Sequence, residues 1–442
     1  MMATDPSRRQ RGFAWRALRA LALALVILFP VALALAVFET EPEVAVWVPP
    51  DGTAAGQARE VAGRIKALMA DGDPAAGWQV TEAEINGVLA SAERLLPGMR
   101  GRAAVGESRL AIDVSLGAPL LPGGLWSNLH LAFAESREGI EVAAARVGRL
   151  PLPPALAERG LRFALDRIVG PGAGDAATAS IAGLALDAGA ADVAFRTDAA
   201  GQVPLFEMLR SRARGAAGGS ARVLARAQLE ALHHAVGSGL LPRDGSVLAY
   251  LRFAVETAAR QQGSARERAR GALYALALYC GDPAFETVVG VWLPTRMQGE
   301  RNGCAGTTLG GRADLRQHFV ISAALYAATS GTAAFGMGEL KELLDTNPGG
   351  SGFSFDDMAA DAAGGGFART LIAAAPEAWG ALAGQVADEA DILPSLAGLP
   401  SGLSADDFRA RYGDVDSDAY AALVAEIDRR VATLPLHGPA RF

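Results

Sequence analysis

The sequence predicts an α+β fold in three parts: an N-terminal membrane anchor, a module of helices and antiparallel strands, and a larger, mostly helical domain. Three observations lead to this prediction. An uncharged run follows a basic N-terminus, apolar residues alternate with polar ones over residues 110–147, and no such alternation returns after residue 204. With 442 residues, half of them apolar, the chain is long enough to bury more than one core.

The first element is the apolar run of residues 20–38. Five arginines lie in the basic tail before it, over residues 1–19, and acidic residues follow from Glu39. This asymmetry places the tail in the cytoplasm, and the run of 19 residues is close to the length of a membrane-spanning helix. We therefore expect a single-pass protein of a bacterial inner membrane, with the bulk of the chain in the periplasm. The alternative is a cleaved signal peptide, because Ala34-Leu35-Ala36 resembles a cleavage site.

Charge and cysteine content limit the classes of partner and the compartment that the sequence favours. The net charge of −7, without a basic stripe beyond the N-terminus, speaks against nucleic acid as a partner. We expect the partners to be the inner membrane, through residues 20–38, and lipid or other envelope proteins. In an oxidising compartment the only two cysteines, Cys280 and Cys304, can form a disulfide. Such a bridge would stabilise the fold by roughly 3 kcal/mol; the alternative is two buried free thiols.

The α+β module is expected over residues 57–203, after a proline-containing linker over residues 39–56. It opens with a helix over residues 57–69. A second helix starts at Thr81, where Thr81 and Glu84 form a capping box. Period-two alternation then predicts antiparallel strands, and a further helix follows them; these elements span residues 110–116, 129–133, 140–147 and 155–169.

Two stretches of this module resemble a known family. They are TEAEINGVL at residues 81–89 and VGRLPLPPAL at residues 147–156. Together with the strands between them, they resemble the extracytoplasmic part of the YpmS-type family of single-anchor bacterial envelope proteins, over residues 57–165. The resemblance implies a helix-on-sheet module at the outer face of the membrane that handles lipid. The alternative is a scaffold without a ligand.

The helical domain is expected over residues 204–442, and its most specific stretch is residues 312–364. Asp314 and His318 are four residues apart there, so a helix places them on one face. A carboxylate beside an imidazole raises its basicity and fixes its tautomer, as a general base or a metal ligand requires. The alternative for Asp314 is a helix-start residue favoured by the helix dipole.

Two more predicted helices bring further carboxylates to this stretch. One carries Glu342 and Asp345 on the same face as Gly338, a glycine that permits close approach. The next begins at Ser354 as its N-cap residue and places Asp357 and Asp361 four residues apart. The structural alternatives are a helix-start role for Asp357 and a buried ion pair of Asp361 with Lys341 or Arg312.

The pattern of this stretch resembles the YfiM-type family of small bacterial lipoproteins and, more distantly, the VanZ-like membrane families. The resemblance implies a functional site without a settled chemistry. It is carried by Asp314, Gln317, His318, Phe319, Ser322, Lys341, Glu342, Asp345, Gly350, Ser351, Gly352, Ser354, Asp357, Asp361 and Gly364.

The sequence leaves two main alternatives for the function. The first is a periplasmic binding or assembly factor in lipid or peptidoglycan biology, and the second is a periplasmic hydrolase that uses a divalent metal. A third possibility is a lipid-binding module with a helical domain that only scaffolds. A catalytic cluster should line an open cleft and carry perturbed carboxylates, whereas a structural one should be closed and fully paired. The candidates are His318, Asp314, Glu342 and Asp361 as catalytic residues, Asp345 and Asp357 as metal ligands, and Ser354, Ser351 and Lys341 as further polar members.

Overall fold

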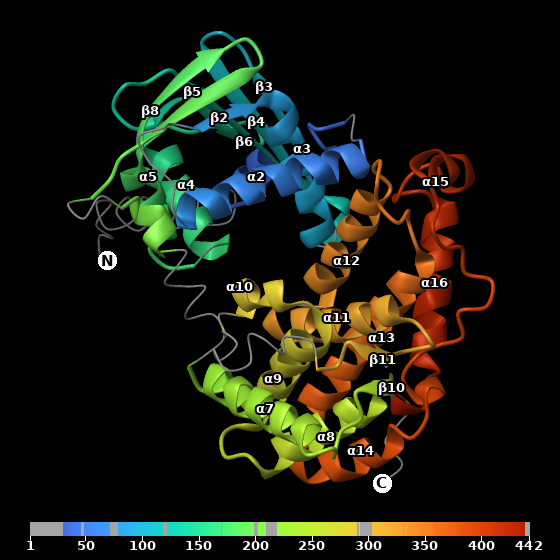
Figure 1. The fold of residues 1–442 in the computed structure, drawn as a ribbon. Coiled ribbons are helices and arrows are strands. Elements are labelled where there is room, and N and C mark those ends of the chain that lie inside the picture. Colours follow the sequence, from blue (N-terminus) through green and yellow to red (C-terminus); the bar gives the residue numbers. More distant parts are fainter. Residues whose placement is uncertain are drawn as a thin grey trace, which may run out of the picture.

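The computed structural model describes most of the chain and confirms the α+β class. A sheet-containing module forms one end of the molecule and a helical domain the other (Figure 1). The described residues are 30–45, 48–70, 78–117, 122–168, 170–198, 202–208, 219–289, 291, 303–329 and 331–437.

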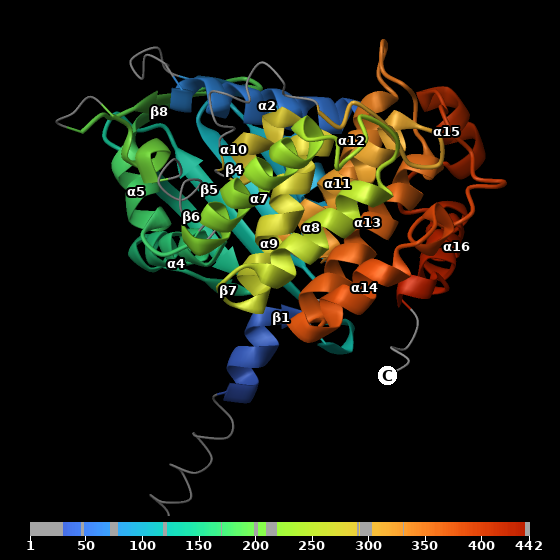
Figure 2. The same cartoon turned by 60° about the horizontal axis from the view of Figure 1, so that its bottom comes forward.

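The predicted membrane anchor falls largely outside the described residues, as does the basic tail. Residues 30–37 are helical and project from the body of the molecule (Figure 2). Within the described ranges, no helix combines the length and the apolar character needed to cross a membrane.

The segment expected to be a linker is in large part bound to the module. Its first residue, Glu39, forms strand β1 (Phe38–Glu39) together with the last residue of the predicted anchor, and β1 pairs with β5 (Trp126–Ala134). The backbone N–H of Glu43 donates to Asn128 Oδ1 at 2.9 Å, and that of Val44 donates to Ser115 Oγ at 3.1 Å. Helix α2 (Gly52–Ala70) begins before the predicted start of the module. This part of the chain is therefore not a free linker.

Two antiparallel sheets form the module. In the larger one the strand order is β3-β4-β5-β6-β7, with β1 added beside β5. In the smaller one the order is β2-β9-β8. Besides β5 and β1, the strands are β2 (Trp78–Thr81), β3 (Met99–Val105), β4 (Arg109–Leu116), β6 (Glu141–Val147), β7 (Leu150–Pro151), β8 (Ile181–Asp187) and β9 (Ala190–Phe195).

Helices cover the sheets and close a small apolar core. Helix α3 (Glu82–Leu95) starts with the predicted capping box, in which Thr81 and Glu84 satisfy each other's backbone N–H groups. Helix α4 (Pro154–Ile168) packs on β6, and α5 (Ala173–Ser180) follows it. Leu131 and Phe133 of β5 are buried in the core between these elements.

The helical domain has a larger and continuous apolar core. A short parallel pair of strands, β10 (Asp244–Ser246) and β11 (Gly306–Thr308), lies beside it. The disulfide predicted between Cys280 and Cys304 is present, and both residues are fully buried. The helices are α7 (Gly219–Gly237), α8 (Leu248–Arg260), α9 (Ala265–Leu276), α10 (Glu286–Val289), α11 (Ala313–Ala328), α12 (Gly331–Asp345), α13 (Phe355–Ala373), α14 (Trp379–Gln385), α15 (Ala405–Tyr412) and α16 (Asp418–Ala432).

Helices α11 and α13 approach each other until their backbones touch. A Cβ atom on Gly364 of α13 would lie 2.1 Å from the carbonyl oxygen of Phe319 on α11, so only glycine fits there. The ring of Phe319 also packs on that of Phe367, with centroids 5.7 Å apart. This close crossing fixes the side chains that the two helices present to each other.

Helix α12 connects the helical domain to the module, against α2 and α3 (Figure 1). Arg94 of α3 forms an ion pair at 3.4 Å with Glu339 of α12, which is buried. The hydroxyl of Tyr420 on α16 also donates to Glu339. Burial raises the pKa of Glu339, although Arg94 and Tyr420 act in the opposite direction. The module thus holds in place the helix that carries Lys341 and Glu342.

Candidate functional site

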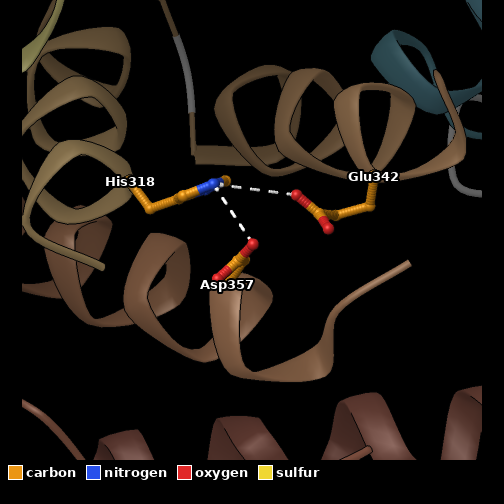
Figure 3. A group of neighbouring side chains, drawn as sticks. All are labelled: His318, Glu342 and Asp357. Carbon is orange, nitrogen blue, oxygen red and sulfur yellow. Dashed lines mark ion pairs between the residues drawn. The ribbon is translucent and has the colours of Figure 1, made fainter. Parts of the chain in front are cut away.

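Three buried side chains from three helices converge at one point (Figure 3). They are His318 of α11, Glu342 of α12 and Asp357 in the first turn of α13. Nε2 of His318 lies 3.8 Å from Oε1 of Glu342 and 3.5 Å from Oδ2 of Asp357. The facing atoms of the three residues all lie within 4.8 Å of one another.

Each of these side chains is held by a second contact on its far side. Nδ1 of His318 lies 3.1 Å from Oδ1 of Asp361, and Oε2 of Glu342 accepts a hydrogen bond of 3.0 Å from the backbone N–H of Ser354. Oδ1 of Asp357 accepts one of 3.1 Å from Arg312. One nitrogen and two oxygens therefore face a common centre, and their partner atoms are anchored behind them.

A cation already lies at this centre. The ammonium of Lys341 is 2.9 Å from Nε2 of His318, 2.9 Å from Oε1 of Glu342 and 2.8 Å from Oδ2 of Asp345. When His318 is neutral, Nε2 can accept from this ammonium if the imidazole proton is on Nδ1, facing Asp361; the imidazolium carries a proton on both nitrogens and cannot accept. This tautomer leaves the Nε2 lone pair directed at the centre.

Burial and neighbouring charges perturb the groups around the centre. Burial alone would lower the pKa of His318, but Asp361 and Asp357 stabilise the imidazolium and raise the pKa to about 9. Burial raises the pKa of Glu342 to about 7, with Lys341 and His318 opposing it, and it also raises the pKa of Asp357. Burial opposes the charge of Lys341, yet Glu342 and Asp345 raise its pKa overall. The cations at the centre oppose the effect of burial on these carboxyls without cancelling it.

The three facing atoms fit a divalent metal ion. In a tetrahedral site with bonds of about 2.1 Å, two ligand atoms lie about 3.4 Å apart, close to the 3.5 and 3.8 Å found between His318 and its two carboxylate neighbours. One imidazole and two carboxylates form a ligand set used by zinc and other divalent metals. The contacts behind the ligands correspond to the outer partners that orient metal ligands in proteins.

His318 and Asp357 line a cavity of about 480 Å³ between α11, α12 and α13, whereas Glu342 is fully buried and does not line it. Lys341 and Asp314 also line it, and their side chains are nearly half exposed, so the cavity opens to solvent. At its inner end Oδ2 of Asp361 is buried and, among the described residues, has no hydrogen-bond partner. The cluster is therefore neither closed nor fully paired.

Asp361 takes the position beside His318 that we expected Asp314 to occupy. The carboxylate of Asp314 instead pairs with Arg312 at 2.6 Å, and this contact lowers the pKa of Asp314. Asp361 bonds neither Lys341 nor Arg312, and Oδ1 accepts from Ser322 at 2.5 Å besides facing His318. The prediction that Asp314 orients the imidazole is therefore wrong, because the carboxylate of Asp314 forms an ion pair with the nearby guanidinium of Arg312.

The other predicted residues divide between the centre and its rim. Asp357 faces the centre as expected of a ligand, whereas Asp345 is bonded to Lys341 and to Ser351 at 3.1 Å and stands outside the group that can share one ion. Ser354 is the N-cap residue of α13 as predicted, but its hydroxyl bonds Ser401 at 2.6 Å rather than the helix end.

Sequence reasoning missed some contributions to the site. Ser322 lies one helical turn after His318, so its spacing was a usable signal for the hydrogen bond to Asp361. Arg312 was considered only as a partner of Asp361, although it binds Asp356 at 2.7 Å and Asp357 at 3.1 Å. Nothing near Ser401 in the sequence signalled its place beside Ser354.

Comparison of the chain with protein-family models, with curated proteins and with solved structures found no significant match. The function is therefore argued from the geometry of the site.

Proposed function

We propose that this chain is a metal-dependent hydrolase of the bacterial envelope, with its metal held by His318, Glu342 and Asp357. The observation that carries the proposal is the arrangement of these three side chains, each with one atom directed at a common centre and the other anchored outside it. A purely structural cluster has no need for three such acceptors beside a cavity that opens to solvent.

The residues around the centre have distinct roles in the proposed reaction. Asp361 accepts the Nδ1–H of His318 and so keeps Nε2 free to act as a ligand. A divalent ion bound there would lower the pKa of a water molecule and polarise the bond to be cleaved. Arg312, which also lines the cavity, is positioned to stabilise negative charge that develops on the substrate.

The compartment is part of the proposal. The basic N-terminus followed by an apolar run supports a single span over residues 20–38, with the hydrolase in the periplasm. The disulfide between Cys280 and Cys304 supports an oxidising location. Lipid and peptidoglycan are the substrate classes that this location offers. The resemblance of residues 312–364 to the YfiM-type lipoproteins supports a functional role for this segment.

The test is metal binding by the full-length chain in mild detergent, after dialysis against a chelator. Calorimetric titration with Zn²⁺ and Mn²⁺ should give one ion per chain, and hydrolysis of phospholipid vesicles or peptidoglycan should depend on that ion. Asp357→Asn removes a ligand and should weaken binding by at least tenfold. Asp356→Asn is the matched control, since Asp356 lies in the same helical turn and, among the described residues, its side chain bonds only Arg312.

Two results would refute the proposal: no stoichiometric binding of either ion to the wild type, or an equal loss in both variants. Stoichiometric binding without hydrolysis of either substrate would favour the alternative, a binding or assembly factor that uses the same site.

A further inference from the structure

A second cavity adjoins the candidate metal centre. It has a volume of about 550 Å³ and lies between the C-terminal half of α11, the N-terminal half of α12, α13 and α16. Ser322 and Asp361 line both cavities, so the two meet at the buried carboxylate beside His318. The two cavities are therefore adjacent, and the shared side chains are hydrogen-bonded to each other at 2.5 Å.

The lining of the second cavity changes from its inner end to its mouth. The inner end has the polar groups of Ser322 and Asp361, both buried. The outer end has Arg369 and Asp428, both exposed. Between them the wall is apolar and consists of Tyr326, Gly331, Ala334, Phe335, Ala362, Gly365, Gly366, Val424, Val431 and Ala432.

Small residues create the space in this wall. A Cβ atom on Gly365 would meet nothing closer than Cδ2 of Tyr326, at 3.8 Å, which is an ordinary van der Waals distance. The wall therefore has room for an apolar group, and the hydroxyl of Tyr326 is the one polar side-chain group among the described residues along its middle. The polar groups at the inner end are the hydroxyl of Ser322 and the carboxylate of Asp361, and Ser322 Oγ donates a hydrogen bond of 2.5 Å to Oδ1 of Asp361.

We propose that the second cavity binds the hydrocarbon chain of an amphipathic substrate, so that its polar head and the bond to be cleaved reach the metal centre. The inference rests on the proposed hydrolase function and names its substrate class: an ester or amide of a long-chain fatty acid, as found in membrane lipids. An unbranched acyl chain suits this place because it needs apolar contacts along its length and polar contacts only at one end.

The test uses Gly365→Leu, whose side chain would occupy the cavity, in the full-length, zinc-loaded chain. The control is Gly160→Leu, since Gly160 lies in the middle of α4 with nothing within 4 Å of a Cβ atom. Binding of dansyl-undecanoic acid is followed by fluorescence, and kcat/KM is measured for p-nitrophenyl acetate, octanoate and laurate. If Gly365→Leu lowers the thermal stability of the chain, Ala334→Leu fills the same cavity from α12.

In the wild type, kcat/KM should rise by about fourfold for each methylene buried. In Gly365→Leu the dansyl probe should bind at least tenfold more weakly, and the laurate reaction should slow while the acetate reaction is unchanged. The Gly160→Leu control should match the wild type. Equal probe binding in both variants, or hydrolysis without preference for chain length, would overturn the inference and leave the hydrolase in place. Probe binding that only Gly365→Leu abolishes, without hydrolysis of any ester, would support the acyl cavity and refute the hydrolase.

Discussion

The ammonium of Lys341 lies where the proposed metal ion would bind, so the two cations should compete. It contacts Nε2 of His318, Oε1 of Glu342 and Oδ2 of Asp345 at 2.8 to 2.9 Å. A divalent ion at this centre requires the lysine to swing out toward solvent, which its half-exposed side chain allows. Removing the competing charge with Lys341→Met should therefore strengthen metal binding, although it deletes a polar residue from the site.

The magnitude follows from the contacts that metal binding must break. A hydrogen bond to a charged group contributes about 1.5 to 3 kcal/mol when buried, but only about 0.2 to 1 kcal/mol when the pair is exposed. The side chain of Lys341 is 45% exposed, so the lower range is the better guide. Three such contacts sum to about 2 kcal/mol, which corresponds to about a 30-fold gain in affinity.

The assay is competition for Zn²⁺ against a chromophoric chelator, with the full-length chain in detergent. The pH should lie well above the pKa of about 7 that burial gives Glu342, because removal of the neighbouring lysine favours protonation of that carboxyl. Lys341→Arg keeps the positive charge and should bind zinc no more tightly than the wild type. If Lys341→Met bound zinc more weakly than the wild type, the lysine would itself be part of the site, and the competition argued from its position would be wrong.

Three further predictions concern stability. Burial raises the pKa of Glu339, so the contribution of this carboxyl to the free energy of unfolding is present below pH 4.5 and is lost as the pH rises through its folded-state pKa. The Tm of Glu339→Gln should therefore rise relative to that of the wild type between pH 4 and 7. A Tm difference that stays constant over this range would contradict the prediction. Cys280→Ser should lower the free energy of unfolding by about 3 kcal/mol, and added reductant should have the same effect on the wild type; no response to reductant would contradict a structural role for the bridge to Cys304. In denaturant titrations Gly364→Ala should cost about 1 to 3 kcal/mol because it clashes with backbone, whereas Gly365→Ala should gain about 0.5 to 1 kcal/mol; the reverse order would contradict the packing of α11 on α13.

Local signals in the sequence predicted much of the secondary structure. The capping box at Thr81 and the alternation along β4, β5 and β6 each appear where expected. Strand β3 was missed because its buried positions are Gly101, Ala103 and Val105, and such small side chains produce no strong alternation. Strands β8 and β9 are alanine-rich and were missed for the same reason.

The site shows a different limit of sequence reasoning. Helical spacing identified His318, Glu342 and Asp357, but it could not decide which carboxylate faces which base. Asp361 is 43 residues from His318 and reaches it only because Gly364 lets α13 touch α11. The packing of neighbouring helices therefore determines which carboxylate contacts His318, and the spacing within a single helix does not.

The cost of burying this cluster is itself an argument for function. Glu342 and Asp357 are buried in a domain whose core is otherwise apolar, and the raised pKa values of both carboxyls reflect that burial. Apolar residues of similar volume often stabilise a fold as well as a buried ion pair does, or better. Acceptors that converge on a solvent-accessible centre at such a cost are explained by a ligand that completes them.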